Sequence, residues 1–225
     1  MKSLTPLNSR LDSRLAAYAA VATAALAAPA LPSAEAAIVY SGPINIAIPL
    51  TTAGVYINLV TGVTSVTPAG APGWDINPFS ATGLSWFSPA NISHGYVDEF
   101  PGGTSLTLVD NMAFGTPISA LTQTTVWTTN GAVETTGPTA WNLNSSNNYV
   151  AFRFLNEATG IVNFGWAQVQ LGATLTSRSI IGYGYENTGL ASPVGVVPEP
   201  STFGLLGLVA VGALGLRAWR GRKAA

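Results

Sequence analysis

The sequence predicts an all-β protein, with a single antiparallel β-sandwich of the jelly-roll or lectin-like type between two targeting helices. Three observations favour this fold class. Charged residues make up only 8% of the 225 residues, and glycine (24) and proline (15) are plentiful, whereas about a quarter of a typical domain is charged. Apolar residues in the middle of the chain alternate with neutral polar ones in short runs. No long segment there follows the 3.6-residue period of an amphipathic helix.

Short alternating runs predict strands through the middle of the chain. Apolar residues occupy every second position over residues 44–48 and 55–59, and a turn is expected at Thr61-Gly62. Because successive side chains of a strand point to opposite faces of a sheet, each run gives one face suited to burial. Further strands are expected at Leu106–Leu108, around Val126 and at Ile180–Tyr185, with a type I′ hairpin turn at Asn130-Gly131.

The clearest unit is a β-hairpin predicted over Tyr149–Leu171, with its turn at Asn156–Gly160. Each aromatic residue buried by this hairpin contributes about 2–3 kcal/mol. Many short strands at such spacing, without helices between them, predict one sandwich domain over residues 37–193. The residues expected to share a face are Val150, Phe152 and Phe154 on the first strand, and Phe164, Trp166 and Gln168 on the second.

Residues 1–36 predict a secretory signal peptide. A basic start is followed by an alanine-rich apolar stretch and by a small-residue site, Ala34-Glu35-Ala36. This order predicts signal peptidase as a partner and places the cleavage after Ala36. The alternative is an alanine-rich amphipathic helix that belongs to the fold. Polar residues there do not follow the helical period, and prolines interrupt its end.

Residues 194–225 combine three features in a fixed order. A Val-Pro-Glu-Pro motif at 197–200 comes first, and its prolines fix φ on both sides of the glutamate. An apolar run follows, and we expect a transmembrane helix over about 202–219. A basic tail over 217–223 comes last, which the positive-inside rule keeps in the cytoplasm. The residues that determine this topology are Arg217, Arg220, Arg222 and Lys223.

This ending resembles the PEP-CTERM sorting signal of Gram-negative bacteria that make extracellular polysaccharide, and the similarity covers roughly the last 28 residues. In that family a membrane enzyme, the exosortase, recognises the Pro-Glu-Pro and removes the span and the basic tail. The resemblance implies an exosortase substrate that is anchored in the inner membrane, with its β-domain outside the cytoplasm, and then sent to the cell surface or medium. The recognition element it implies is Val197, Pro198, Glu199 and Pro200. An ordinary C-terminal membrane anchor is the alternative.

A second resemblance covers most of the middle of the chain. The segments GVYINLVTG (54–62), GWDINP (73–78) and GYGYENTG (182–189), together with the predicted hairpin, look similar to segments of other secreted bacterial proteins that end in this signal. That group has no assigned activity. The resemblance supports one β-domain and implies no catalytic residue.

The charge distribution argues against nucleic acid as a partner. Between the two ends only Arg153 and Arg178 are basic, against seven acidic residues. A phosphate backbone needs clustered cations, which this region lacks. The sequence has no cysteine, which excludes disulfides, thiolate metal sites and thiol nucleophiles. We therefore expect no cofactor and no metal.

The chain offers few residues for catalysis. His94 is the only histidine, and no Gly-x-Ser-x-Gly elbow accompanies it. We expect it in a surface loop rather than in a hydrolase triad or a zinc site. Asp98 and Glu99 are adjacent, and on a strand they would point to opposite faces and could not share a glycosidase site. We expect solvated loop acids, with a calcium site in a turn as the alternative.

Six aromatic residues of the middle region have two interpretations, core filling, which is usual for tryptophan in a small sandwich, and a surface on which sugars stack. They are Trp74, Trp86, Trp127 and Trp141, with Tyr56 and Phe87. The most suggestive stretch predicts glycan contacts at Trp74, Asp75 and Asn77.

Taken together, the two ends of the chain and the lack of catalytic residues give the first hypothesis, an exported, non-enzymatic surface or matrix protein. The alternatives are a module that binds exopolysaccharide and, third, a glycoside-active enzyme on a lectin-like fold.

Overall fold

The computed structural model describes residues 37–98, 108–120 and 126–197, and every structural statement below concerns these residues. All described residues belong to one compact unit, Ala36–Ala225. They form β-strands joined by turns and one short 3₁₀ helix, η1 (Pro68–Gly70). The predicted all-β class is confirmed.

Several predictions fall on other parts of the chain. The signal peptide, the residues 198–200 of the motif, the span and the basic tail all lie outside the described residues. Among the described residues, no helix has the length and apolar character needed to cross a membrane.

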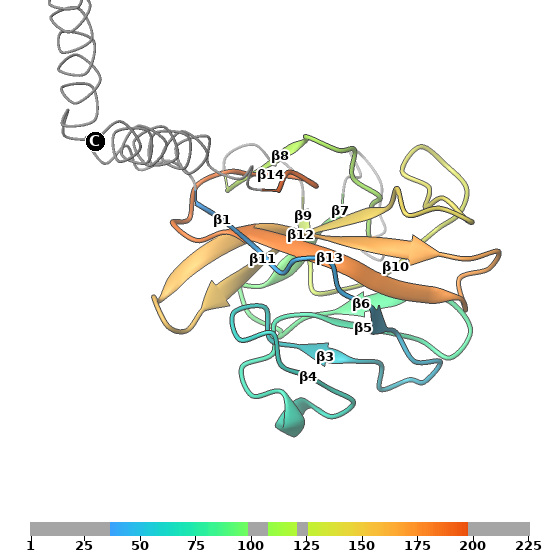
Figure 1. Cartoon of the computed structure of the whole chain (residues 1–225), viewed down its shortest axis with the longest axis horizontal. Helices are drawn as coiled ribbons and strands as arrows, with labels where there is room; N and C mark the ends of the chain where they lie inside the picture. The colour runs from blue at the N-terminus through green and yellow to red at the C-terminus, as the bar shows by residue number, and fades with distance from the viewer. Residues whose placement is uncertain (1–36, 99–107, 121–125, 198–225) are drawn as a thin grey trace, which may run out of the picture. The chain divides into compact units, whose positions relative to one another are not determined.

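A seven-stranded antiparallel sheet is the largest element of the domain (Figure 1). Its order is β1-β13-β12-β11-β7-β9, and β2 also pairs with β13. The three longest strands, β11, β12 and β13, follow one another in sequence and pair as neighbours. The strands are β1 (Ile38–Tyr40), β2 (Ile46–Ala47), β7 (Gly95–Asp98), β9 (Val126–Thr128), β11 (Tyr149–Asn156), β12 (Ile161–Leu171) and β13 (Arg178–Glu186).

The β11–β12 hairpin has the turn that the sequence predicts. Asn156 and Ile161 pair at its end, and residues 157–160 form the turn. The carbonyl of Asn156 accepts the N–H of Gly160 at 2.7 Å, and its Oδ1 accepts the N–H of Ala158 at 3.1 Å. Gly160 has a φ of 70°, a conformation that glycine adopts without steric cost.

A β-bulge adjusts which side chains of β13 face the core. Gln168 pairs with Gly182, but Val169 pairs with Ile180, so one residue of β13 has no partner on β12. Such an extra residue reverses the alternation of side chains along the strand. Ile180 and Tyr183 therefore both belong to the same core, although their spacing is odd.

One face of the large sheet carries the first core. Val150, Phe152 and Phe154 of β11 pack there with Ile57 of β3 and Trp86 of β6. Figure 1 shows that β3, β4, β5 and β6 lie together on one side of this sheet. The covering strands form a three-stranded sheet of order β10-β6-β5 and a two-stranded sheet: β3 (Tyr56–Ile57), β4 (Thr64–Ser65), β5 (Asn77–Phe79), β6 (Ser85–Phe87) and β10 (Asn130–Ala132).

The opposite face of the large sheet carries the second core. Phe164 and Trp166 of β12 pack there with Ile118 and Val194. Ile118 belongs to β8 (Pro117–Ile118), and Val194 directly follows β14 (Ser192–Pro193). These two strands pair with each other. As predicted, Val150, Phe152 and Phe154 share one face of the sheet, and Phe164 and Trp166 share a face, which is the opposite one. The jelly-roll or lectin-like arrangement stays a prediction.

The hairpin turn predicted at Asn130-Gly131 is wrong. Both residues lie within β10, which pairs with β6. Ala132 forms a parallel bridge with Leu108, and a Cβ on Gly131 would lie 2.8 Å from Cγ2 of Val109 and 3.0 Å from the carbonyl carbon of Leu108. Glycine is required here because another backbone segment approaches closely, and not because the chain turns.

Arg178 ties β13 to two segments that are distant in sequence. It is only 7% exposed, and burial lowers its pKa. Its guanidinium donates to the carbonyls of Pro49 at 2.9 Å and Ser80 at 2.5 Å, and more weakly to that of Ile48. Ser80 has a φ of 123°, which is unfavourable for a residue other than glycine. The arginine therefore holds a strained loop against the sheet.

Candidate functional site

The last described residues, 192–197, form a C-terminal strap along segment 113–118. Within it β14 pairs with β8 in antiparallel register. Val194 is buried, and its N–H donates to the carbonyl of Thr116 at 2.9 Å. The carbonyl of Val194 accepts the N–H of Gly115 at 2.8 Å. Since Val194 also belongs to the second core, both backbone pairing and side-chain burial hold the chain as far as this residue.

Gly195 continues the strap beneath two aromatic rings. Its φ is 74°, and a Cβ at this position would lie 2.6 Å from Cδ2 of Phe114 and 3.0 Å from Cε1 of Tyr149. Only glycine combines this backbone conformation with so close an approach. Val197, two residues later, is 41% exposed. The strap therefore leads directly into the Val-Pro-Glu-Pro motif at 197–200.

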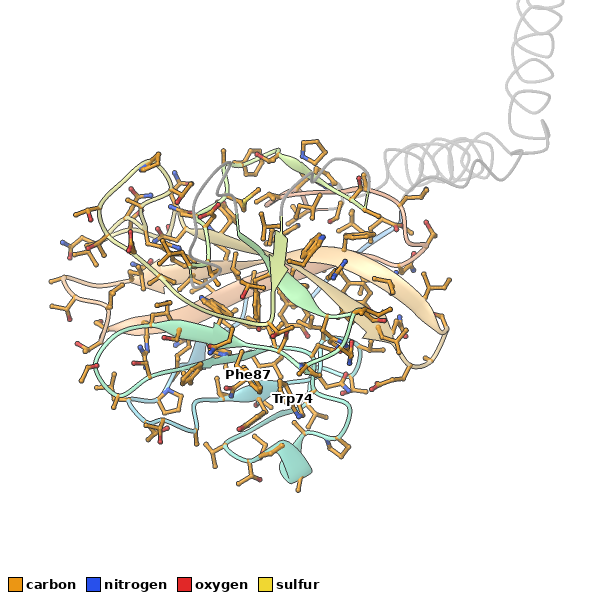
Figure 2. All side chains as sticks on the ribbon, turned by 180° about the vertical axis from the view of Figure 1, so that it is seen from behind. Trp74 and Phe87 are labelled. Atoms are coloured by element: carbon orange, nitrogen blue, oxygen red, sulfur yellow. The ribbon has the colours of Figure 1, made fainter. Side chains whose placement is uncertain are left out.

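A cluster of three half-buried aromatic residues lies beside β3 and β6, and we call it the aromatic cluster: Tyr56, Trp74 and Phe87. The ring centroid of Trp74 is 4.9 Å from that of Tyr56, in an edge-to-face arrangement, and 5.8 Å from that of Phe87. Figure 2 shows Trp74 and Phe87 next to each other. Much of each ring is used against its neighbours, which leaves a restricted area for any ligand.

The two polar residues predicted to join Trp74 are buried. Asp75 is 1% exposed and Asn77 is 3% exposed. One carboxylate oxygen of Asp75 accepts the N–H of Leu59 at 2.8 Å, and Nδ2 of Asn77 donates to the carbonyl of Ala53 at 2.9 Å. Of the three predicted glycan contacts, only Trp74 is therefore placed where it can reach a ligand.

His94 does not lie at the surface, so the expectation of a surface-loop histidine is wrong. It is 6% exposed, and its Nδ1 lies 2.7 Å from Oδ1 of Asn91. The same oxygen accepts the N–H of Ser93 at 2.9 Å, which identifies it as an acceptor and Nδ1 as the donor. Nε2 lies 3.5 Å from Oδ1 of Asp75. Sequence reasoning missed this pair because 19 positions separate its two members.

Asp75 and His94 meet inside the fold. Because Nδ1 of His94 donates to Asn91, its Nε2 faces the carboxyl group of Asp75. Burial raises the pKa of Asp75 above its ordinary value of 3.8, and the bonds to His94 and to the N–H of Leu59 oppose that rise. The pair joins the loop before β7 to the segment before β5.

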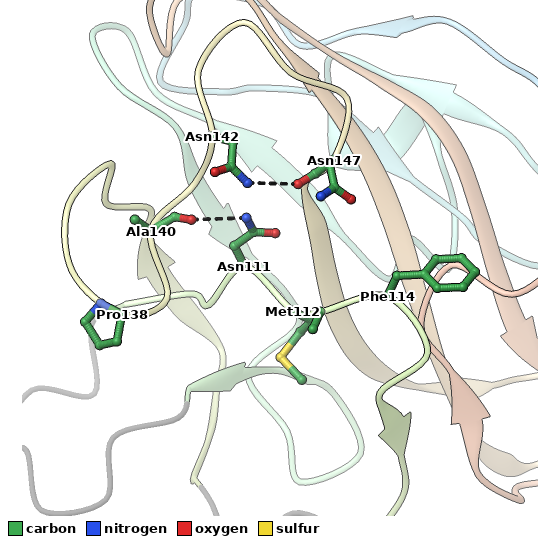
Figure 3. Close-up of a pocket in the computed structure, with 8 residues that line it drawn as sticks. Asn111, Met112, Phe114, Pro138, Ala140, Asn142 and Asn147 are labelled. Atoms are coloured by element: carbon green, nitrogen blue, oxygen red, sulfur yellow. Dashed lines mark hydrogen bonds between the residues drawn. The ribbon is translucent and has the colours of Figure 1, made fainter.

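A pocket of about 350 Å³ lies between segment 111–114 and the segment that joins β10 to β11 (Figure 3). None of the residues that line it is charged. In Figure 3 the amide nitrogens of Asn142 and Asn111 point to the main-chain carbonyls of Asn147 and Ala140, and the ring of Phe114 points away from them. Residues that line the pocket include Asn111, Phe114, Pro138, Ala140, Asn142 and Asn147.

Hydrogen bonds fix part of this amide lining. Nδ2 of Asn111 donates to the carbonyl of Ala140 at 3.1 Å and to Oδ1 of the fully buried Asn148 at 3.2 Å. Nδ2 of Asn142 donates to the carbonyl of Asn147 at 3.0 Å. Oδ1 of Asn142 and the side chain of Asn147 are exposed and make no hydrogen bond to another described residue. The pocket thus presents free amide groups on a fixed support.

The other tryptophans proposed for a stacking surface do not join the aromatic cluster. Trp86 and Trp141 are 0% and 2% exposed and belong to the first core. Trp127 lies on β9, where the guanidinium of Arg153 sits 4.8 Å from its ring centroid. Core filling, the alternative reading, is therefore the role of Trp86 and Trp141.

The acidic pair is only partly visible in the structure. Asp98 is the last residue of β7, and Glu99 lies outside the described residues. Within the described part of the chain, no three His, Asp or Glu side chains are grouped closely enough to hold a metal ion.

A comparison with protein-family models matches residues 196–223 to the PEP-CTERM protein-sorting motif. The chain carries a PEP-CTERM motif. This match is consistent with an exosortase substrate and implies export with membrane-associated sorting. The match begins at Val196, within the C-terminal strap, so the motif directly adjoins the folded domain. Searches of curated proteins and of solved structures found no match to the chain.

Proposed function

We propose that the chain is an exported, non-enzymatic protein that an exosortase processes at the PEP-CTERM motif for release to the cell surface or extracellular matrix. The family-model match over residues 196–223 is the observation that carries this proposal. The strap supports it, because a cut within residues 197–200 leaves β14 and every other described strand in the released part.

The route to that cut uses both ends of the chain. Signal peptidase removes residues 1–36 after Ala36 during export. The apolar span over about 202–219 then holds the protein in the inner membrane, with the basic residues of 217–223 in the cytoplasm and the β-domain outside. The order of these segments in the sequence supports this route.

The surroundings of His94 support a non-enzymatic role. Its Nδ1 donates to Asn91 and its Nε2 faces Asp75, so both ring nitrogens are engaged within the fold. A general base needs a ring nitrogen within reach of a substrate.

We further propose that the domain is a β-sandwich of the jelly-roll or lectin-like type. The apolar core between the large sheet and the β10-β6-β5 sheet supports that architecture.

The replacement Glu199→Ala tests the sorting proposal in the producing cell. We expect full-length protein to accumulate in the inner membrane, because the recognition element has lost its only carboxylate. Glu134→Ala is the matched control, since Glu134 is exposed and remote from the motif in sequence. Normal processing of Glu199→Ala would contradict the assignment of the motif as the recognition element.

A second candidate function is the binding of a neutral glycan, and the Asn-lined pocket is the observation that favours it. Amide groups donate and accept hydrogen bonds, as vicinal hydroxyls do, and the lining carries no charge that would demand an ionic ligand. A volume of about 350 Å³ is within the usual range for small-molecule sites. The exposed part of Trp74 offers a separate stacking position.

Retention on the producer's own exopolysaccharide tests this second candidate. We expect the double variant Asn142→Ala/Asn147→Ala to lose retention if the pocket binds the glycan, with Trp74→Ala as the comparison at the aromatic cluster. Loss in Trp74→Ala alone would move the site to that cluster. Failure of the unchanged protein to be retained would remove the glycan function altogether.

A further inference from the structure

Few residues separate the strap from the apolar run in the sequence. Val194 is fully buried, and the N–H of Val196 donates to the carbonyl of Pro193 at 3.4 Å. The apolar run begins at Thr202, so residues 198–201 are all that separates it from the strap. Four residues span at most about 14 Å when fully extended. If the run is in a membrane, the strap must lie close to the membrane surface.

The surface around this exit point is apolar and uncharged. Segments 111–119 and 187–197, which are joined by the β8–β14 pair, contain no charged residue. Phe114 is 63% exposed, Leu190 is 46% exposed and Val197 is 41% exposed. We call the exposed residues of these two segments the exit surface: Ala113, Phe114, Gly115, Pro117, Thr188, Leu190, Ala191 and Val197.

This composition distinguishes the exit surface from the opposite side of the domain. Around β4 the exposed apolar residues Val63 and Val66 are interspersed with exposed threonines at 61, 64 and 67. On the exit surface only Thr188 is polar. Because β8 and Val194 belong to the second core whereas β3 belongs to the first, the exit surface and the β3–β4 pair lie on opposite sides of the large sheet (Figure 1).

We infer that the exit surface rests against the outer lipid surface of the membrane while the chain is anchored, with the ring of Phe114 in the interfacial region. This inference rests on the proposed anchoring of the span. Patches of exposed apolar residues mark interaction surfaces, and Phe and Leu side chains are among those that segments lying on a membrane bury at the boundary between headgroups and acyl chains. The absence of charge allows approach to anionic headgroups without repulsion. The short tether brings this particular surface, and not another, to the lipid.

Single-cysteine labelling tests the inference cleanly because the chain has no cysteine of its own. Phe114→Cys and Val66→Cys place a nitroxide at two sites that are both 63% exposed. The full chain is reconstituted into vesicles of phosphatidylethanolamine and phosphatidylglycerol, and flotation establishes that it is anchored. Collision rates with oxygen and with a water-soluble nickel complex then report the environment of each label.

We expect the label at position 114 to collide with the nickel complex several-fold less often, and with oxygen more often, than the label at position 66. Phe114→Cys removes the ring itself, so Leu190→Cys, which keeps Phe114, is a second reporter with the same expected direction. Failure to float would refute the proposed anchoring. Flotation with equal accessibility at positions 114, 190 and 66 would overturn the lipid contact while leaving anchoring intact. Protection that persists in detergent and grows with protein concentration would also overturn it, because a second copy of the chain would then cover the surface.

Discussion

Replacing Asp75 by asparagine is expected to leave the domain stable at pH 7, whereas replacing it by alanine is expected to destabilise it strongly. In Asp75→Asn the amide oxygen can accept the N–H of Leu59, which the carboxylate accepts at 2.8 Å. The amide nitrogen then replaces the oxygen that lies 3.5 Å from Nε2 of His94. A neutral imidazole that donates through Nδ1 to Asn91 can accept this N–H at Nε2, so every bond is kept.

Asp75→Ala removes these partners and leaves two buried groups unsatisfied. Each unsatisfied buried polar group costs about 1–3 kcal/mol, so the two together cost about 2–6 kcal/mol. For a chain of this size each kcal/mol lowers the melting temperature by roughly 2–4 °C. We therefore expect Asp75→Ala to melt roughly 4–24 °C lower than the unchanged protein, and Asp75→Asn to stay within about 1 kcal/mol of it.

The effect of pH on the same variants has a definite sign. Burial raises the pKa of Asp75 in the folded protein above its ordinary value of 3.8. The folded state therefore binds the proton of the Asp75 carboxyl group more tightly than the unfolded chain does. The stabilisation that this proton gives is fully present below pH 3.8 and is lost as pH rises through the folded pKa of Asp75. The amide of Asp75→Asn does not titrate, so this variant does not lose stability in the same way. The melting temperature of Asp75→Asn minus that of the unchanged protein should therefore increase as pH rises through the folded pKa of Asp75.

Thermal unfolding of the full chain in detergent, followed by tryptophan fluorescence at pH 4 and pH 7, measures both effects. Glu134→Gln, an exposed side chain, is the control and should change neither value. The reasoning is refuted if Asp75→Asn is destabilised at pH 7 as much as Asp75→Ala, because the fold would then depend on the charge itself.

Two further replacements test the packing of the large sheet. Arg178→Lys should lower the free energy of unfolding by about 2–3 kcal/mol, because an ammonium group cannot reach the carbonyls to which the guanidinium donates. Arg153→Lys is the control. It retains a cation near Trp127 and should lower the free energy of unfolding by less than about 1 kcal/mol. Equal effects in chemical denaturation would contradict the role given to Arg178. Gly165→Ala should cost about 1–3 kcal/mol, because its Cβ would lie 2.6 Å from the carbonyl oxygen of Gly184. Gly83→Ala, where the nearest atom is 3.9 Å away, should be tolerated, and tolerance of both would argue against the close β12–β13 approach.

Features encoded by nearby residues could be predicted from the sequence. The β11–β12 hairpin follows from alternation along each strand and from a turn whose bonds all form within residues 156–160. The PEP-CTERM motif was predictable for a related reason, since a linear recognition element and its neighbouring segments are read directly along the chain. In both cases the determining contacts or order lie within a short stretch.

Features that depend on distant contacts could not be predicted in this way. Asn130-Gly131 has the local signature of a turn, but the approach of Leu108 places it in a strand. His94 and Asp75 form a pair only because the fold brings two loops together. Arg178 bonds to carbonyls about 100 to 130 positions away. The exit surface likewise requires knowing that β8 pairs with β14.

The most direct test of the sorting account is the intact mass of the protein isolated from the cell that produces it. The account predicts a chain that begins at Ala37 and ends at or just after residues 197–200, so that both targeting segments are missing and the strap is retained. A mass of 23.1 kDa, that of the whole chain, or a chain that keeps residues 202–223 at the cell surface, would contradict it.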